Sequence, residues 1–133
     1  MGKYFLMLPF FLLFFSCGIF LSQKFHQDIT IDQAAEIIKN HSFDENFVIL
    51  DVRTEREFAS GHIHQAENIN YLSKDFRAKV NRLPKDKTYL VYCRSGIRSQ
   101  KAMEIMKSLG YKKIYNLKSG INGWVKAQKG LVK

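Results

Sequence analysis

The fold and the chemistry of this chain are decided by residues 89–99, which read YLVYCRSGIRS. An apolar, strand-like run ends at Cys93, and a loop with one glycine then leads into a helix. This order places a thiol at the carboxyl end of a strand, facing the positive end of a helix dipole and free backbone N–H groups. A cysteine held there ionises readily beside an anion site. The stretch therefore predicts a nucleophile that attacks or carries a negatively charged group.

Helical patterns and short apolar runs alternate along the rest of the chain. Helices are expected over residues 31–40, 55–60, 73–83 and 98–109, with a last short helix beginning near residues 123–124. The apolar runs at residues 47–50, 66–69, 89–92 and 114–117 are the expected strands. Strands that alternate with helices predict an α/β fold, in which helices flank a central, mostly parallel sheet of about five strands.

The helix starts and faces can be assigned residue by residue. Capping boxes begin the first two helices, with Thr30 and Gln33 in one and Thr54 and Glu57 in the other. Ser73 is expected to cap the third helix, whose apolar stripe continues to Leu83 before Pro84. The inward face of the fourth helix is expected to be formed by Ala102, Ile105, Met106 and Leu109.

Two of the expected strands are followed directly by polar residues. Asp51 and Arg53 follow the first run, and Cys93 and Arg94 follow the third. Open parallel sheets bind ligands outside the carboxyl ends of their strands, so both sets meet in one crevice if the strands are neighbours. For Asp51, two interpretations stay open: a partner of an active-site arginine or of the loop backbone, or an ordinary strand-end salt bridge or helix cap.

No metal site or cofactor is predicted. His62 and His64 are expected to be structural or surface residues, and no Cys/His spacing is typical of zinc.

The first 21 residues have the pattern of an export signal. Lys3 supplies a positive charge, residues 4–15 are almost wholly apolar, and small residues follow at 16–18. Residues 14–17, FFSC, are similar to a bacterial lipobox, which predicts lipidation of Cys17; an uncleaved signal anchor is the alternative. Residues 22–28 are expected to be a tether and residues 29–133 the domain. The protein is thus predicted to be exported and held at a membrane by its N-terminus, facing the periplasm or the cell exterior.

The charge balance narrows the kinds of partner. The chain has 21 Lys and Arg residues against 12 Asp and Glu, a net charge of +9 with histidine neutral. These charges are scattered and form no block, and an exported protein rarely meets nucleic acid. Small anions or a membrane surface are therefore the expected partners. If Cys17 is acylated, Cys93 is the only thiol left, which in an oxidising compartment implies a chemical role.

Taken together, the ordered motifs resemble the rhodanese-like family of sulfurtransferases over about residues 28–129. The landmarks are Asp51-Val-Arg53, Glu57-Phe58, Gly61-His-Ile63, Asn68-Ile69, the loop from Tyr92 to Ser99, Asn116-Leu117, Gly120 and Gly123-Trp124. The sequence departs from the family pattern at Gln65, Asn70 and Ser119. These positions border turns and lie outside the cysteine loop.

The resemblance implies the fold already expected and a specific reaction. Cys93 would be the catalytic carrier: its thiolate attacks the outer sulfur of thiosulfate, releases sulfite and becomes a persulfide. The substrate-binding loop would be formed by Arg94, Ser95, Gly96, Ile97 and Arg98, whose N–H groups curl around the sulfur while the two arginines hold the sulfonate. Cyanide, a thiol or a thiol-bearing protein would then take the sulfur. No cofactor is implied.

Two other functions stay open at this stage. One is a relay module that binds a protein partner or hands it a persulfide. The other is a cysteine phosphatase or arsenate reductase, which also holds an oxyanion between a thiolate and an arginine. Here only four residues separate Cys93 from Arg98, one fewer than in the related dual-specificity phosphatases, which shrinks the cradle toward a single sulfur. Phosphoester cleavage also requires a general acid, and no residue stands out as one.

Overall fold

The core of the molecule is a parallel β-sheet. A computed structural model describes Gly2 and residues 23–133. The sheet has the strand order β1-β5-β4-β2-β3, and its members are β1 (Phe25–Ile29), β2 (Phe47–Asp51), β3 (Glu67–Asn68), β4 (Thr88–Tyr92) and β5 (Lys113–Leu117). Every neighbouring pair is parallel. The predicted α/β architecture is confirmed.

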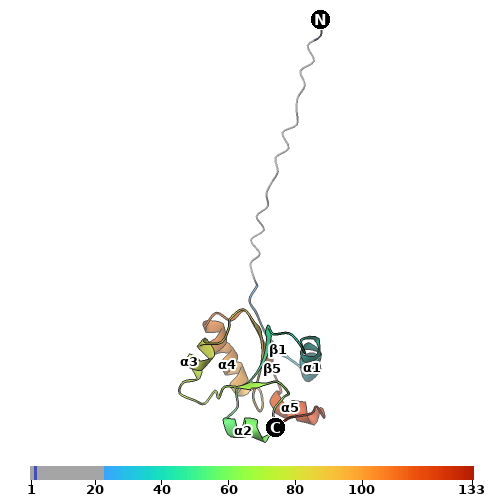
Figure 1. Ribbon diagram of the computed structural model, residues 1–133, viewed down its shortest axis with the longest axis vertical. Coiled ribbons are helices and arrows are strands. Elements are labelled where there is room, and N and C mark those ends of the chain that lie inside the picture. Colours follow the sequence, from blue (N-terminus) through green and yellow to red (C-terminus); the bar gives the residue numbers. More distant parts are fainter. Residues whose placement is uncertain (1, 3–22) are drawn as a thin grey trace.

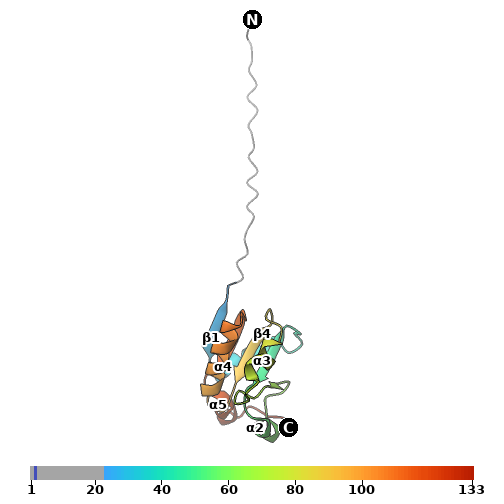
Figure 2. The same ribbon diagram turned by 90° about the vertical axis from the view of Figure 1, so that its left-hand side faces the viewer.

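Helices cover both faces of the sheet, as Figures 1 and 2 show. Helices α3 (Phe76–Asn81) and α4 (Ile97–Ser108) pack on one face, and α1 (Ile31–Asn40) and α5 (Gly120–Lys126) on the other. Successive side chains of a strand point to opposite faces, so Leu90 joins the cluster under α1 and α5 while Val91 joins the one under α3 and α4. Both residues are fully buried, which explains why β4 is an unbroken apolar run.

The first two helices begin where their capping boxes predict. In α1 the Thr30 hydroxyl accepts from Gln33 N, and the Gln33 side chain accepts from Thr30 N. Helix α2 (Glu55–Ser60) has the same reciprocal arrangement between Thr54 and Glu57, and Gly61 follows its end. Both boxes satisfy backbone N–H groups that a helix start otherwise leaves unpaired.

The third helix is shorter than predicted, and the fourth packs its predicted face, Ala102, Ile105, Met106 and Leu109, on the core with Met103 in addition. Ser73 does not cap α3: its hydroxyl is hydrogen-bonded to the carboxylate of Asp75, the residue before the helix. Leu83 lies beyond the helix end and still packs against the core. In α4 Met103 is buried, while Ile105 is only partly buried because it lies toward the rim of the helix face.

Residues 25–28, expected in the tether, belong to the sheet as β1. The strand pairs with β5 in register from Phe25 with Lys113 to Ile29 with Leu117. Its sequence, FHQDI, has no apolar alternation because it is an edge strand that buries only Ile29. The folded domain therefore begins by residue 25 and not at residue 29. Backbone pairing, which sequence patterns do not report, holds this strand in place.

The C-terminal residues return across the carboxyl edge of the sheet. After α5, His62 and Val132 form an antiparallel bridge, with hydrogen bonds of 2.8 Å and 2.9 Å in both directions. The Trp124 indole N–H donates to the Gly130 carbonyl at 3.1 Å. This tail ties the last residues to the segment that follows α2.

The expected export signal, residues 1–21, and its lipidation residue Cys17 lie outside the described residues apart from Gly2. Among the helices that are described, none has the length and apolar character needed to cross a bilayer.

Candidate active site

Cys93 follows β4 directly, at the carboxyl edge of the sheet next to the end of β2. Its side chain is buried, with 1% of its surface exposed. The Gly96 N–H donates to the Cys93 Sγ at 3.1 Å, and the Ser99 Oγ lies 3.4 Å from the same sulfur. The reactive atom is therefore enclosed by polar hydrogens of its own loop and of the first turn of α4.

These contacts favour the thiolate. Burial alone raises the pKa of the Cys93 thiol, but hydrogen bonds from the Ser99 hydroxyl and from the N–H groups of Ser99, Ser95 and Gly96 outweigh it. The net effect is a lowered pKa, since each of these donors stabilises the anion. Of the N–H groups expected around the sulfur, that of Gly96 donates to it directly, and those of Ser95 and Ser99 add to the lowering of the Cys93 pKa.

The loop needs glycine at position 96. Gly96 precedes α4 with φ of 94°, in the left-handed region that L-residues avoid. A Cβ added there would lie 2.0 Å from the carbonyl oxygen of Lys118, in the segment between β5 and α5. Conformation and lack of space together exclude a side chain at this position.

The start of α5 orients the loop. Ile121 N donates to the Cys93 carbonyl at 2.9 Å, and Asn122 N donates to the Arg94 carbonyl at 3.1 Å. In a trans peptide the N–H points opposite to the carbonyl, so the next two N–H groups face away from α5. The second of these, on Ser95, is among the donors that lower the Cys93 pKa.

Arg98 is held by a carboxylate. Its two terminal nitrogens donate to the two oxygens of Glu57, at 2.8 Å and 2.9 Å. The side chains are 21% and 29% exposed. Hydrogen bonding to Arg98 lowers the pKa of Glu57 to about 2, and Thr54 adds to the effect through its N–H and hydroxyl. The Cys93 sulfur is among the charges that raise the pKa of Arg98, so the guanidinium lies within electrostatic reach of the thiolate.

The other predicted substrate-binding residues point outward to different degrees. Arg94, Ser95 and Ile97 are exposed, Gly96 is buried and Arg98 is half-buried. Within residues 23–133 no hydrogen bond or ion pair joins the Arg94 guanidinium to another group. Of the five predicted residues, Gly96 contacts the Cys93 sulfur and Arg98 lies within electrostatic reach of it. Among the described residues, Arg98 is paired with Glu57 and Arg94 is unpaired.

Asp51 and Arg53 form a separate, closed pair after β2. Asp51 is fully buried and Arg53 is 5% exposed. The Arg53 Nη2 lies 2.7 Å from Asp51 Oδ2 and also donates to the Gly61 carbonyl at 2.8 Å. The Arg53 N–H donates to Asp51 Oδ1 at 2.9 Å. Of the two interpretations of Asp51, the strand-end salt bridge is the one that the structure contains.

His62 and His64 have the surroundings expected of structural or surface residues. The ring of His62 stacks on Phe58 at 3.7 Å between centroids and bonds the Phe58 carbonyl at 3.0 Å. His64 is exposed. Among the described residues, no three His, Cys, Asp or Glu side chains are grouped as metal ligands.

Sequence reasoning missed two contributors to the site. The sequence marks Glu57 as part of a capping box and as a landmark of the family pattern, but it does not link Glu57 to its partner Arg98, 41 residues away. The start of α5, with the N–H groups of Ile121 and Asn122, was not connected with the cysteine loop. Only Gly120, with φ of 59° and its Cβ position 2.4 Å from the Arg94 carbonyl oxygen, gave a signal of close backbone approach.

Fold and site together define a class: a parallel α/β domain with a hydrogen-bonded cysteine at a strand end, poised to hold an anionic sulfur. The sequence model of the Rhodanese-like domain family matches residues 32–127, and the chain belongs to that family.

Relatives and solved structures agree with this assignment. A sulfurtransferase of Allochromatium vinosum is 34% identical over 82 residues, which cover 62% of this chain and 75% of that protein. A putative sulfurtransferase of Bacillus subtilis, YtwF, is 37% identical, with 61% and 76% covered. A rhodanese-related protein from Thermoplasma volcanium superposes with a TM-score of 0.68 at 31% identity, covering 80% of this chain and 97% of that one.

One relative carries a different name. A tRNA uridine(34) hydroxylase of Buchnera aphidicola is 35% identical over 88 residues, covering 62% of this chain and 28% of that protein. The rhodanese-like fold therefore also occurs as part of a longer protein named for another reaction, and family membership alone does not identify the sulfur donor.

Proposed function

We propose that this protein takes a sulfane sulfur from thiosulfate or a similar donor and passes it, through a persulfide on Cys93, to a thiol or cyanide. The observation that carries the proposal is the Cys93 sulfur, buried and hydrogen-bonded by Gly96 N at 3.1 Å, with a lowered pKa. A thiolate that is stabilised by backbone amides is both the nucleophile and the leaving group that sulfur exchange requires.

The reaction balances without a proton donor. The Cys93 thiolate attacks the outer sulfur of thiosulfate, the S–S bond breaks, and sulfite leaves with the bonding electron pair. The enzyme is left with a persulfide anion. Cyanide then attacks the terminal sulfur, leaves as thiocyanate, and returns the electron pair to Cys93 as thiolate. The amides around Sγ stabilise the charge that returns at this step.

The arginines supply positive charge for the donor's sulfonate. Arg94 is exposed and has no partner among the described residues, so its guanidinium is free to bind an incoming anion. Arg98 uses its two terminal nitrogens on Glu57, and its remaining N–H donors are left for substrate. Charge-assisted contacts from both arginines would orient the thiosulfate with its outer sulfur toward Cys93.

Mass spectrometry after exposure to thiosulfate tests the proposal. We expect Cys93 to gain one sulfur atom, and cyanide to remove it with release of thiocyanate. Cys93→Ser should abolish thiocyanate formation and keep its far-UV circular dichroism, because the loop backbone forms the cradle. Residual turnover in that variant would contradict the assignment of Cys93.

A relay to a protein partner is the second function to consider, and one feature favours it. Leu72 and Ile97 are each 63% exposed, and both lie at the carboxyl edge where Cys93 lies. Exposed apolar side chains beside a reactive residue are typical of protein contact. A persulfide that resists cyanide and is discharged only by a partner protein would support the relay. Hydrolysis of an aryl phosphate without sulfur loading would instead support the phosphatase alternative.

We further propose that the protein is exported and anchored by residues 1–21, with lipidation at Cys17. The support is the sequence pattern: one positive charge, an apolar stretch and a cysteine flanked by the small residues Ser16 and Gly18. Incorporation of labelled palmitate into the full chain, and its loss in Cys17→Ala, is the expected result. Membrane attachment of Cys17→Ala without any label in either protein would favour the uncleaved anchor.

A further inference from the structure

The amino ends of the strands form one continuous surface, at the opposite end of the sheet from Cys93. Phe25 N donates to the Lys112 carbonyl at 2.6 Å, and Lys112 N donates to the Lys85 carbonyl at 3.4 Å. Thr88 N, at the start of β4, donates to the Asn46 carbonyl at 2.8 Å. These bonds join the start of β1 to the segments before β2, β4 and β5, so groups far apart in the sequence share this edge.

Basic side chains gather on this surface. We call it the basic edge and define it by Lys24, Arg82, Lys85, Lys87, Lys112 and Lys113, all exposed or half-exposed. Within residues 23–133 none of the six takes part in an ion pair. The acidic residues of the same segments are Asp44, Glu45 and Asp86, and Asp44 is bonded to His41. An excess of unpaired positive charge therefore faces solvent here.

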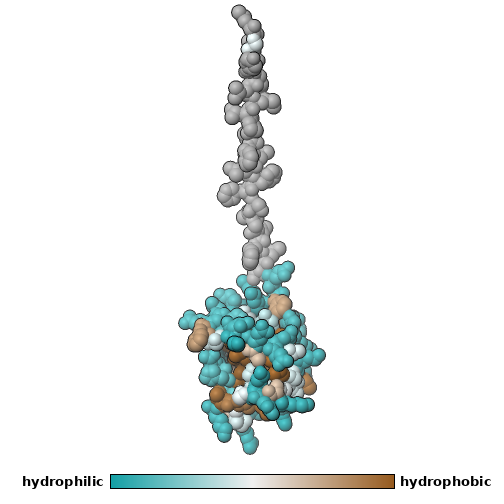
Figure 3. Space-filling view, turned by 90° about the vertical axis from the view of Figure 1, so that its right-hand side faces the viewer, coloured by the Kyte–Doolittle hydropathy of each residue, from teal (hydrophilic) through white to brown (hydrophobic). Residues whose placement is uncertain are grey.

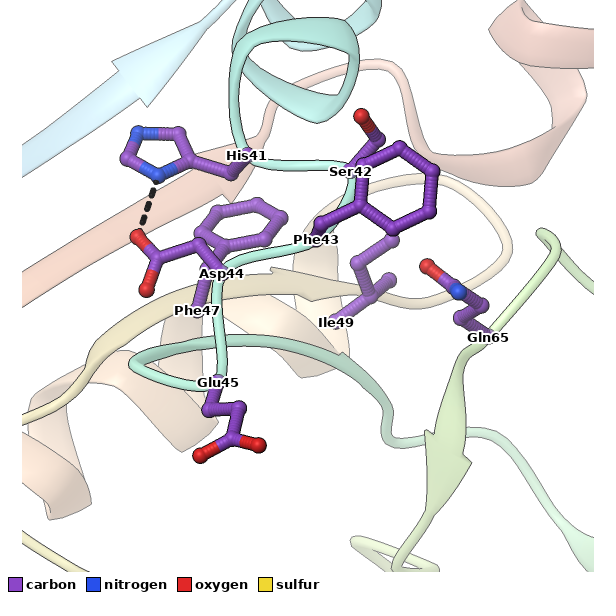
Figure 4. A pocket seen from close by; sticks show the side chains of 8 residues that line it. All are labelled: His41, Ser42, Phe43, Asp44, Glu45, Phe47, Ile49 and Gln65. Atoms are coloured by element: carbon purple, nitrogen blue, oxygen red, sulfur yellow. Dashed lines mark hydrogen bonds and ion pairs between the residues drawn. The ribbon is translucent and has the colours of Figure 1, made fainter.

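A large apolar side chain projects beside the basic edge. Phe43, in the segment between α1 and β2, is 98% exposed. It borders an open hollow of about 360 Å³, whose side chains Figure 4 shows, with Phe47 and Ile49 at its base. The hollow is also lined by Asp44 and Glu45, and the lysines of the basic edge lie outside it. An exposed aromatic residue at the same end of a domain as several lysines is a combination by which peripheral proteins bind at the boundary between lipid headgroups and acyl chains.

The chain enters the domain at this same edge. Residue 23 lies at the amino end of β1, and Figures 1 and 2 show that end pointing away from α2 and the C-terminus. Figure 3 shows mainly hydrophilic residues around it. Any membrane anchor in residues 1–21 would join the domain here. Because each long strand has five residues, the two ends of the sheet lie roughly 17 Å apart.

We infer that the basic edge docks on an anionic phospholipid surface and holds the Cys93 loop toward the aqueous phase. The charge comes from three segments at one end of the sheet, which suits a broad charged surface, and Phe43, from a fourth segment, supplies the apolar contact. The docked orientation leaves the cysteine open to soluble donors and acceptors. Export in the proposed function predicts a nearby membrane, but the inference itself depends only on the charges and placement of this edge.

Lysine footprinting of the full chain tests the orientation. The protein is added to phosphatidylcholine vesicles with or without phosphatidylglycerol, and exposed amines are acetylated with a water-soluble reagent and measured by mass spectrometry. We expect labelling of Lys24, Lys112 and Lys113 to fall about fivefold on anionic vesicles at low salt, and to recover at high salt. Lys74 and Lys118, which follow the carboxyl ends of β3 and β5, should keep their labelling.

Two variants make the test specific. In Lys87→Gln/Lys112→Gln/Lys113→Gln, protection of Lys24 on anionic vesicles should drop to its level on neutral vesicles. The matched control removes three lysines away from the basic edge, Lys74→Gln/Lys118→Gln/Lys133→Gln, and should retain the protection.

Three results would overturn the inference. They are equal labelling on both kinds of vesicle, equal protection at both ends of the domain, and protection by an oligonucleotide in place of vesicles. Because no sulfur transfer is measured, failure of this inference leaves the proposed function untouched, and the reverse also holds.

Discussion

Two neighbouring strands, β2 and β4, end in loops that use similar residues for different purposes. After β2, Asp51 and Arg53 close on each other and are nearly inaccessible to solvent. After β4, the loop from Cys93 to Arg98 directs its N–H groups at a sulfur atom and leaves Arg94 exposed. One loop satisfies its polar groups internally, and the other keeps donors available.

The comparison separates residues that hold the edge of the sheet together from residues that can meet a substrate. The Asp51–Arg53 pair is directed inward: Arg53 Nε and Nη2 donate to Asp51 and to the Gly61 carbonyl, and the guanidinium carbon lies 5.7 Å from the centre of the Tyr92 ring. The cysteine loop is supported from behind by the start of α5. Catalysis is therefore expected only at the second loop. Mutations in the first loop should mainly lower stability, and mutations in the second loop should also lower activity.

The largest effect is expected for Asp51→Ala. The substitution leaves the Arg53 guanidinium buried without its carboxylate, which costs about 3–5 kcal/mol of unfolding free energy. Chemical denaturation measures it. The double variant Asp51→Ala/Arg53→Met removes both charges and should recover part of the loss. Equal stability of wild type and Asp51→Ala would show that the pair is not the closed structural unit described.

Gly96→Ala should lower the free energy of unfolding by about 3 kcal/mol, because residue 96 has a left-handed φ and its Cβ would meet the Lys118 carbonyl. Thiocyanate formation should be lost with it. Gly110→Ala is the matched control, because Gly110 has φ of 93° and nothing within 4 Å of its Cβ position. It should cost only about 1–2 kcal/mol and leave activity intact. Similar losses in both variants would show that the contact with Lys118 is unimportant.

Arg98→Ala should raise the KM for thiosulfate between roughly tenfold and a hundredfold, the equivalent of a charge-assisted contact of about 1.5–3 kcal/mol. Steady-state thiocyanate assays measure it, with Arg94→Ala compared in parallel. A lowered stability with unchanged KM would show that Arg98 only links α4 to α2 through Glu57. Its role would then be structural, like that of the Asp51–Arg53 pair.

The smallest effect concerns Glu57 and pH. Its folded pKa of about 2 lies below its ordinary value of 4.5, so the pair stabilises the fold above pH 4.5 and is lost as pH falls toward 2. Glu57→Gln should lower the unfolding free energy at neutral pH by less than about 1 kcal/mol, since the pair is partly solvated. The difference from wild type should vanish by about pH 2.

Glutamine is a suitable replacement because Gln33 makes the same capping box in α1, so the helix cap survives. A difference that persists at pH 2 would assign the stabilisation to something other than the ionised carboxylate.

Local signals predicted much of this molecule. Capping residues, apolar runs and the glycine loop depend on neighbours within four or five positions, and they gave α1, α2, four of the strands and the place of Cys93. The sequence left open whether β2 and β4 are neighbours, and the structure shows that they are, with Asp51 in register with Tyr92.

What the sequence did not reveal are contacts between distant segments. The edge strand β1 is polar, so no alternation marks it. Ser73 looked like a cap, but Asp75 lies closer to the helix start and binds its hydroxyl. The partnership of Glu57 with Arg98 joins two helices that only the folded sheet brings together. Such pairs leave no periodicity in a single sequence.

The bridge between His62 and Val132 has a practical consequence for handling the protein. Because Val132 is the next-to-last residue, a tag or fusion partner added after Lys133 starts one residue from that bridge, near the helix that carries Glu57. A spacer is needed there if affinity measurements are to reflect the protein with this bridge intact. Deleting the final three residues would remove the bridge that holds the segment after α2. Because α2 carries Glu57, the deletion would also be expected to change the position of Arg98.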